Sequence, residues 1–165
     1  MTGIMEIREV TDTDEKQRIT RFVLESLPDW FGIAESREQY VRDSTECYFV
    51  AAYDGEQPVG FLCLKETGRA TVELHVMGVL QEYHRKGIGR DLLGKAKKAA
   101  VRQGYSFLQV KTVRMGVYND YDDTNRFYLS LGFMEFEVFP MLWDEQNPCQ
   151  VYVMYLGGDA DNTAE

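Results

Sequence analysis

A strand pattern, a turn with two glycines and a helix pattern follow one another in residues 72–103, and this succession constrains the fold most. Residues 72–80 form an apolar run, and residues 83–90 read Tyr-His-Arg-Lys-Gly-Ile-Gly-Arg. Gly87 and Gly89 lack a Cβ, so the backbone there can turn its N–H groups towards an anion. A helix beginning at this point adds unpaired amides and a dipole that favours negative charge. The turn therefore predicts a site for a phosphorylated ligand, with added charge from Arg85, Lys86 and Arg90.

Two common phosphate-binding motifs fit this turn poorly. The dinucleotide fingerprint G-x-G-x-x-G begins correctly at Gly87 and Gly89, but Leu92 stands in place of its third glycine. A Walker-type G-x-x-x-x-G-K can be written up to Lys95. The next residue, Ala96, lacks the hydroxyl that would bind Mg²⁺. The residues inside that match are also strong helix formers, so we treat it as accidental.

Strand and helix patterns follow one another along the rest of the chain. Strands are predicted over residues 4–10, 47–53, 58–64, 71–79, 107–113, 133–139 and 150–156, and helices over 12–26, 35–43, 87–103 and 122–131. Irregular connections are predicted over 114–121 and 140–148. The apolar face of the first helix is expected to contain Ile19, Phe22, Val23 and Leu27. The crossover from strand 71–79 through a helix to strand 107–113 places these two strands parallel in one sheet.

Length and composition favour one domain of ordinary globular character over residues 1–156. The chain has 165 residues with 44% hydrophobic content, and no apolar run approaches the roughly 20 residues of a membrane span. The N-terminus lacks the pattern of a cleavable signal, which favours a cytoplasmic location without membrane association. Residues 157–165 are small and acidic, so we expect a disordered tail. Cys47, Cys63 and Cys149 are far apart and odd in number, which is typical of buried reduced thiols.

Charge is distributed unevenly. The net charge of -9 argues against general binding of nucleic acids. Residues 69–114, however, hold ten Lys and Arg against three acids, whereas the remainder holds eight against twenty-four. This layout would suit an anionic cofactor at the glycine turn and a cationic second substrate. A solvated basic helix face explains Lys95, Lys97, Lys98 and Arg102 equally well.

Two motifs together resemble the GCN5-related N-acetyltransferase (GNAT) superfamily over residues 72–139. The first is His84-x-x-Gly87-x-Gly89 after a strand ending in Val79, and the second is Tyr128-x-x-x-Gly132-Phe133. The resemblance implies a mixed, mostly antiparallel α/β sheet of about seven strands and about four helices. Its parallel pair would splay where pantetheine lodges, near a bulge at Gly78. It implies acetyl-CoA as co-substrate, with no metal, held by Gly78, Val79, Leu80, His84, Arg85, Lys86, Gly87, Ile88, Gly89, Arg90, Asn119 and Tyr128.

The resemblance also implies catalytic roles. Tyr128 would protonate the leaving CoA thiolate, which is chemically sound because a phenol can donate to a thiolate held in contact with it. The alternative is that Tyr128 only packs on an amphipathic helix. An acceptor amine must lose a proton before attack. Glu73 and His75 share one face of strand 71–79, so Glu73 is our first candidate base and His75 the second.

Two departures from the family pattern stand out. His84 occupies a position usually held by Gln or Arg, though it can still donate a hydrogen bond. Tyr121 stands where many members have an Asn, so the cofactor contact of that Asn is not carried over, although Asn119 lies nearby.

The sequence favours transfer of an acetyl group to a primary amine of a small molecule or peptide, by direct attack in a ternary complex. Cys149 as an acyl-carrying nucleophile is the less favoured route, because no base is placed for it. Two other classes stay open. A CoA-binding sensor or interaction module would tolerate loss of the acid and base, and a nucleotide phosphotransferase would prefer Mg-ATP. The acceptor amine cannot be read from the sequence, and the resemblance makes a homodimer reasonable.

Overall fold

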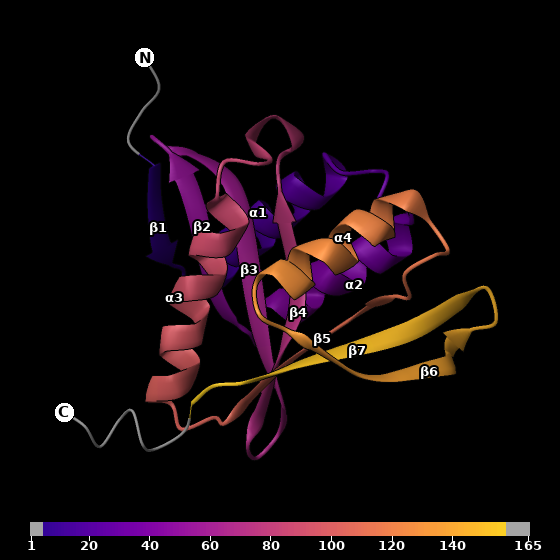
Figure 1. Ribbon diagram of the computed structural model, residues 1–165. Helices are drawn as coiled ribbons and strands as arrows, with labels where there is room; N and C mark the ends of the chain where they lie inside the picture. Colours follow the sequence, from indigo (N-terminus) through magenta and orange to yellow (C-terminus); the bar gives the residue numbers. More distant parts are fainter. Residues whose placement is uncertain (1–4, 158–165) are drawn as a thin grey trace. The chain divides into compact units, whose positions relative to one another are not determined.

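The computed structural model describes residues 5–157, in which seven strands form one mixed sheet (Figure 1). The strand order is β1-β2-β3-β4-β5-β7-β6. The strands are β1 (Met5–Glu9), β2 (Tyr48–Asp54), β3 (Gln57–Gly68), β4 (Thr71–Val79), β5 (Phe107–Val113), β6 (Met134–Asp144) and β7 (Asn147–Tyr155), and the helices are α1 (Thr13–Glu25), α2 (Ala34–Ser44), the 3-10 turn η1 (Gln81–Tyr83), α3 (Ile88–Arg102) and α4 (Asn119–Ser130). This arrangement confirms the predicted fold class.

Contacts within the chain define two compact units. The first contains the described residues up to Lys65 together with His75–Ala99, and the second contains Glu66–Leu74 with the residues from Ala100 onward. Strands β3 and β4 and helix α3 contribute to both units. The expectation of a single domain stays a prediction, and residues 158–165 of the expected tail lie outside the described part.

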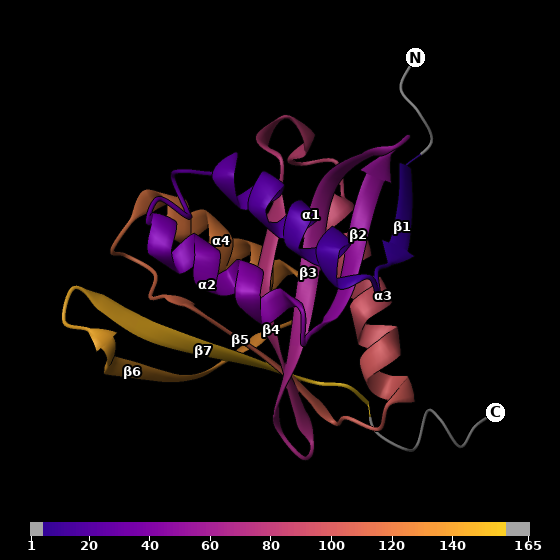
Figure 2. The same ribbon diagram turned by 180° about the vertical axis from the view of Figure 1, so that it is seen from behind.

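In the first unit, helices cover both faces of β2 and β3. α1 and α2 lie side by side on one face, and α3 lies on the other (Figures 1 and 2). β1 pairs antiparallel with β2, and β2 with β3. α1 begins where the Asp12 side chain accepts from the backbone N–H of Glu15 and so caps the helix. On α3, Ile88, Leu92 and Ala96 recur at helical spacing and form a buried stripe.

In the second unit, β5, β7 and β6 form an antiparallel ribbon, and the start of β4 pairs with β5. Thr71, Val72 and Glu73 lie opposite Phe107, Leu108 and Gln109 in parallel register, which confirms the predicted parallel pair. The splay expected for this pair at a cofactor gap stays a prediction. β6 lies at the edge of the sheet, and most of its residues are exposed.

Several predicted boundaries were wrong. α4 begins at Asn119 rather than at residue 122, which shortens the preceding loop. β6 continues through Pro140 to Asp144, and β7 begins at Asn147, where we expected a connection over 140–148. An edge strand tolerates proline because the missing N–H would face outward. On α1, Phe22 is 40% exposed rather than buried, and Leu24 is buried in the core.

All three cysteines, Cys47, Cys63 and Cys149, are buried and free, as expected. Among the described residues, no helix is both long and apolar enough to cross a membrane.

Candidate functional site

The turn between β4 and α3 presents a row of unpaired backbone amides. Arg85 has a φ of 64° and Gly87 a φ of 83°, so the chain reverses sharply before α3 begins. The first amide of the helix with a carbonyl partner is that of Asp91, which donates to Gly87 O over 3.0 Å. In the part of the chain that the structure describes, the amides of residues 85–90 donate to no acceptor. The arrangement fits a bound anion.

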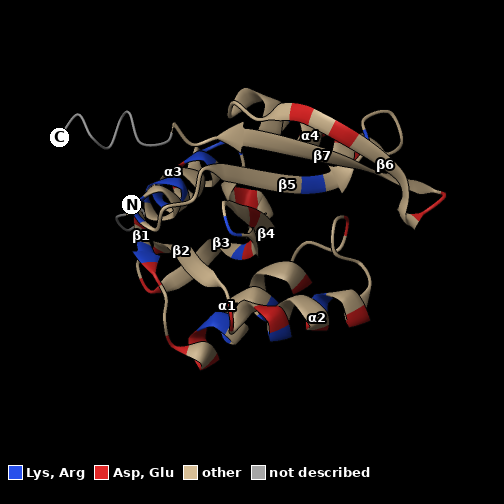
Figure 3. Cartoon of the chain, turned by 90° about the horizontal axis from the view of Figure 1, so that it is seen from below, with Lys and Arg blue, Asp and Glu red and all other residues tan. Residues whose placement is uncertain are grey.

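The side chains of the turn are largely open to solvent. Arg85, Lys86, Gly87 and Arg90 are exposed, whereas Ile88 is buried under the start of α3. Figure 3 shows the basic character of α3, which continues the charge of the turn. Lys86 Nζ lies 5.4 Å from the centroid of the Tyr83 ring, and the Tyr83 hydroxyl donates to Asp54 Oδ2 over 2.7 Å. That hydrogen bond to Asp54 raises the pKa of Tyr83.

The His84 side chain contacts the end of β4 and an aromatic ring. Its Nε2 lies 2.6 Å from the carbonyl oxygen of Val79, and its ring meets the edge of the Trp30 ring at 5.9 Å. Because a carbonyl can only accept, Nε2 carries the proton in this bond. In a neutral imidazole Nδ1 then has none to give, so His84 could donate to a phosphate only when protonated. His84 therefore links the end of β4 to the turn, which is a structural role that the motif alone does not reveal.

Close packing against α1 explains why a glycine stands at position 78. A Cβ built there would lie 3.0 Å from Val23 Cγ1 and 3.2 Å from Leu27 Cδ1, so α1 packs closely on β4 at this point. Leu80 follows β4, and its backbone N–H donates to Val59 O over 2.8 Å. The contacts expected of Gly78, Val79 and Leu80 with pantetheine stay predictions, as does the bulge at Gly78.

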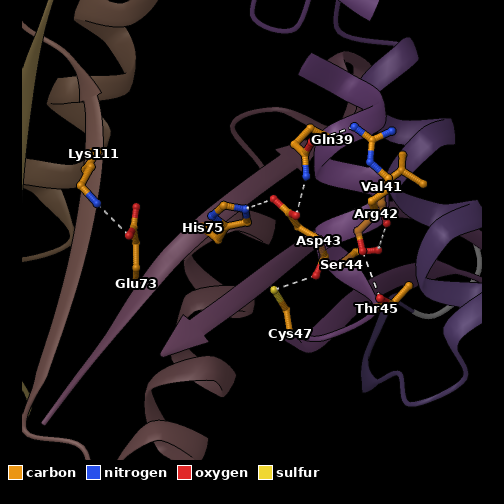
Figure 4. Close-up of polar contacts among 10 residues, drawn as sticks. All are labelled: Gln39, Val41, Arg42, Asp43, Ser44, Thr45, Cys47, Glu73, His75 and Lys111. Atoms are coloured by element: carbon orange, nitrogen blue, oxygen red, sulfur yellow. Dashed lines mark hydrogen bonds and ion pairs between the residues drawn. The ribbon is translucent and has the colours of Figure 1, made fainter. Parts of the chain in front are cut away.

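His75, the second candidate base, lies in the first unit and points towards Asp43 (Figure 4). Its Nε2 is 3.0 Å from Asp43 Oδ2 on α2, and its ring meets the edge of the Tyr40 ring at 5.3 Å. The His75 side chain is 17% exposed. Burial alone would raise the pKa of Asp43, but hydrogen bonds from Gln39 and His75 hold that pKa below its ordinary value. The site thus contains an imidazole paired with a carboxylate.

Glu73, the first candidate base, belongs to the second unit and is already paired. Its Oε1 accepts from Lys111 Nζ over 2.9 Å, and its side chain is 12% exposed. Lys111 therefore occupies one of the two carboxylate oxygens of Glu73 with a charge-assisted hydrogen bond.

Tyr128 is buried in an aromatic cluster of the second unit. Its ring lies 5.6 Å from Phe133 and 6.2 Å from Tyr152, centroid to centroid, and 7% of the residue is exposed. Asn125, one turn earlier on α4, is fully buried and bonded to Tyr152. Asn119 is the first residue of α4 and is exposed. The acid role of Tyr128 and the cofactor contact of Asn119 stay predictions.

Three partners in these arrangements were missed by sequence reasoning: Asp43, Lys111 and Asn125. Asn125 did leave a signal, because it falls on the buried stripe of α4 with Tyr128, and a polar residue in such a stripe needs a partner. Asp43 and His75 are 32 residues apart, and no local pattern indicates that they meet.

The alternative route through Cys149 gains nothing from the site. Cys149 is fully buried, and burial raises the pKa of its thiol, which disfavours a nucleophilic thiolate. Within residues 5–157 there is no group of three or more His, Cys, Asp or Glu side chains that could hold a metal ion.

Comparison with known proteins gives a consistent family. The model of the acetyltransferase (GNAT) family matches residues 8–133. An uncharacterized N-acetyltransferase of Chlorobaculum tepidum is 29% identical over 114 residues, which is 67% of this chain and 64% of the relative. The chain therefore matches less than two thirds of the length of that curated relative.

Solved structures share the fold. A GNAT-family protein from Desulfovibrio desulfuricans aligns with a TM-score of 0.83 at 20% identity, over 93% of this chain and all of the other. An aminoglycoside 6'-N-acetyltransferase complexed with coenzyme A aligns with a TM-score of 0.70, also at 20% identity, over 92% of this chain and 97% of the other.

Proposed function

Because the chain belongs to the acetyltransferase (GNAT) family, we propose that it transfers an acetyl group from acetyl-CoA to a primary amine of a small molecule or peptide. The observation that carries the proposal is the row of unpaired amides at residues 85–90, flanked by exposed Arg85, Lys86 and Arg90. Such a row suits a diphosphate better than a single charged side chain does, because several donors converge on one anion. We keep the cytoplasm as the proposed location.

Acetyl-CoA would supply the acetyl group as a thioester, whose carbon–sulfur bond breaks as the acceptor nitrogen forms the new carbon–nitrogen bond. The chain's own residues handle the protons. A base on β4, Glu73 or His75, takes one proton from the acceptor ammonium so that the nitrogen gains a free electron pair. The Tyr128 hydroxyl gives a proton to the thiolate and regains one from the acceptor nitrogen. One proton is released overall, and the rest of the rate enhancement comes from holding two substrates together in a ternary complex.

The acceptor would meet aromatic side chains near the base. Tyr40 contacts both His75 and Phe31, and the Phe31 carbonyl accepts from Arg37 Nη1 over 2.7 Å. These rings, with the Asp43 carboxylate behind His75, favour a cationic amine. This supports the proposed class of acceptor and leaves open whether it is a small molecule or a peptide.

Consumption of acetyl-CoA with a panel of amines tests the proposal. We expect Tyr128→Phe to lower kcat about 10²-fold and to change the Kd for acetyl-CoA, measured by calorimetry, by far less. Tyr155→Phe, an exposed tyrosine on β7, is the matched control and should leave kcat unchanged. Binding of acetyl-CoA without turnover of any amine would instead indicate a sensor. Thermal stabilisation by Mg-ATP and none by acetyl-CoA would indicate a phosphotransferase.

A homodimer is part of the proposal as well. β6 is an edge strand with exposed Met134, Phe136, Met141 and Leu142, a composition that is unusual for a surface facing only solvent. Sedimentation velocity at several protein concentrations tests this, and a monomer at all of them would exclude it.

A further inference from the structure

A chain of hydrogen bonds runs along α2 to β4 inside the first unit (Figure 4). Arg42 Nη2 donates to Gln39 Oε1 over 2.7 Å, and Gln39 Nε2 donates to Asp43 Oδ1 over 2.8 Å. The other Asp43 oxygen, Oδ2, lies 3.0 Å from His75 Nε2. Because the oxygen of Gln39 accepts from Arg42, its NH₂ group is the end that faces Asp43. The guanidinium, which can only donate, therefore determines the orientation of the Gln39 amide.

The last bond of this chain determines the tautomer of His75. An ionised carboxylate only accepts, so Nε2 must carry the proton, and in the neutral ring Nδ1 has a free electron pair. Tyr40 packs edge-on against the imidazole, with 69° between the ring planes. The hydrogen bond to Asp43 and the edge contact with Tyr40 together restrict rotation of the ring. Nδ1 is thus held ready to take up a proton.

We infer that Asp43 is a positioning residue, which keeps neutral His75 in the Nε2–H form so that Nδ1 is the base of the reaction. This inference rests on the proposed function and chooses between the two candidate bases. One N–H bond of the acceptor ammonium breaks, an N–H bond forms at Nδ1, and the electron pair stays on the acceptor nitrogen. The positive imidazolium is then stabilised by Asp43. Glu73, whose Oε1 already accepts from Lys111, is the less suitable of the two.

Other ionisable groups surround the pair. Tyr40 lies on α2, and Cys47 Sγ donates to the Asp43 carbonyl over 3.3 Å. Lys65 on β3 also acts electrostatically on Asp43 and lowers its pKa, in addition to the hydrogen bonds described above. Cys63 is fully buried, and burial raises the pKa of its thiol, so it stays neutral. Asp43 is the carboxylate that directly contacts the ring.

Nuclear magnetic resonance of the imidazole nitrogens tests the inference without any substrate. The chain has two histidines, so His84→Gln assigns the spectrum. We expect wild-type His75 as the Nε2–H tautomer. In Asp43→Asn, the new amide oxygen still accepts from Gln39, so the amide nitrogen faces His75 Nε2 and forces the Nδ1–H tautomer. Gln39→Ala in the Asp43→Asn background lets that amide turn and should restore part of the Nε2–H form.

An Nδ1–H tautomer in the wild type, or a tautomer unchanged by Asp43→Asn, would overturn the inference. Kinetics provide the second readout, with the fastest of spermidine, kanamycin and an alanyl peptide as acceptor. Asp43→Asn should lower kcat about 10²-fold and change the KM for acetyl-CoA less than twofold. Glu38→Gln, which breaks the exposed ion pair of α2 with Arg21, is the matched control.

Failure of the proposed function and failure of the inference about Asp43 and His75 would give different results. If no amine consumes acetyl-CoA, the proposed function fails whatever the tautomer. If turnover is normal in Asp43→Asn and falls in Glu73→Gln, the acetyltransferase stands and our choice of base is wrong.

Discussion

Tyr152 on β7 and Asn125 on α4 are both fully buried and share a hydrogen bond, with the phenolic O–H donating to Oδ1 at 2.5 Å. The Asn125 amide nitrogen also donates to Val113 O over 2.9 Å and to Tyr121 O over 2.6 Å. One side chain thus joins α4 to β5 and β7. All of its polar atoms are satisfied, which allows it to be buried without penalty.

Tyr152→Phe removes the donor and leaves the Asn125 oxygen without a partner. We expect a loss of about 1 to 3 kcal/mol in the free energy of unfolding, because the buried oxygen gains no water in exchange. Urea denaturation measures this loss. Tyr155→Phe, on the same strand but 59% exposed, should change stability by less than about 0.5 kcal/mol. Equal midpoints for the two variants would show that the hydrogen bond is dispensable.

Gly87→Ala tests the turn. A Cβ at this position meets nothing within 4 Å, so any effect comes from its φ of 83°. Left-handed backbone costs alanine about 1 to 2 kcal/mol, and relaxation of that strain would misdirect the neighbouring amides. We expect weaker binding of CoA by calorimetry and a lower melting temperature. Gly94→Ala, in the interior of α3 with equally open space, should instead raise stability by up to about 1 kcal/mol.

His84→Ala tests the support beneath the turn. Loss of the hydrogen bond to the Val79 carbonyl should weaken CoA binding about two- to tenfold, the usual range for one hydrogen bond. His84→Gln can still donate to that carbonyl and should stay close to the wild type. Equal CoA affinities for His84→Ala and His84→Gln would mean that the hydrogen bond to the Val79 carbonyl does not orient the turn.

The lowered pKa of Asp43 predicts how stability depends on pH. A carboxyl group whose pKa is lower in the folded than in the unfolded chain stabilises the fold above its unfolded pKa of about 3.9. That contribution disappears as the pH falls through the folded pKa. Wild type should therefore exceed Asp43→Asn in stability at pH 6, and the difference should shrink towards pH 3. Urea midpoints at pH 3, 4, 5 and 6 measure it, and a constant difference would contradict the prediction.

Periodicity and glycine placement predicted most of the fold. β5 was predicted with its observed bounds, and α1 and α3 were predicted to within one residue at each end, because their apolar residues repeat regularly and capping or glycine signals flank the two helices. The prediction missed the true start of α4 at Asn119 because Tyr118, the residue at its N-cap, makes no side-chain capping bond. The helix start is instead joined to the preceding loop by Gly116 N, which donates to Asp122 Oδ1 over 2.7 Å. Such a contact is set by the tertiary path of the loop and has no local sequence signature.

The candidate site was predictable in part. The glycine turn could be recognised because its chemistry depends on consecutive residues. The partners of His75 and Glu73 could not, because Asp43 and Lys111 reach them from elements 32 and 38 residues away. A one-dimensional pattern places a side chain on a face of a strand, but which group it meets depends on how the elements pack.

Because all three cysteines are buried, the rate at which their thiols are modified reports how often the surrounding structure opens. Cys47 and Cys63 belong to the first unit and Cys149 to the second, and none is more than 5% exposed. An alkylating reagent can reach each thiol only when the surrounding segment opens, so modification rates follow local opening equilibria. Equal rates at all three sites would mean that the halves of the chain open as one cooperative block. Faster labelling of Cys149 would identify a separately unfolding C-terminal region.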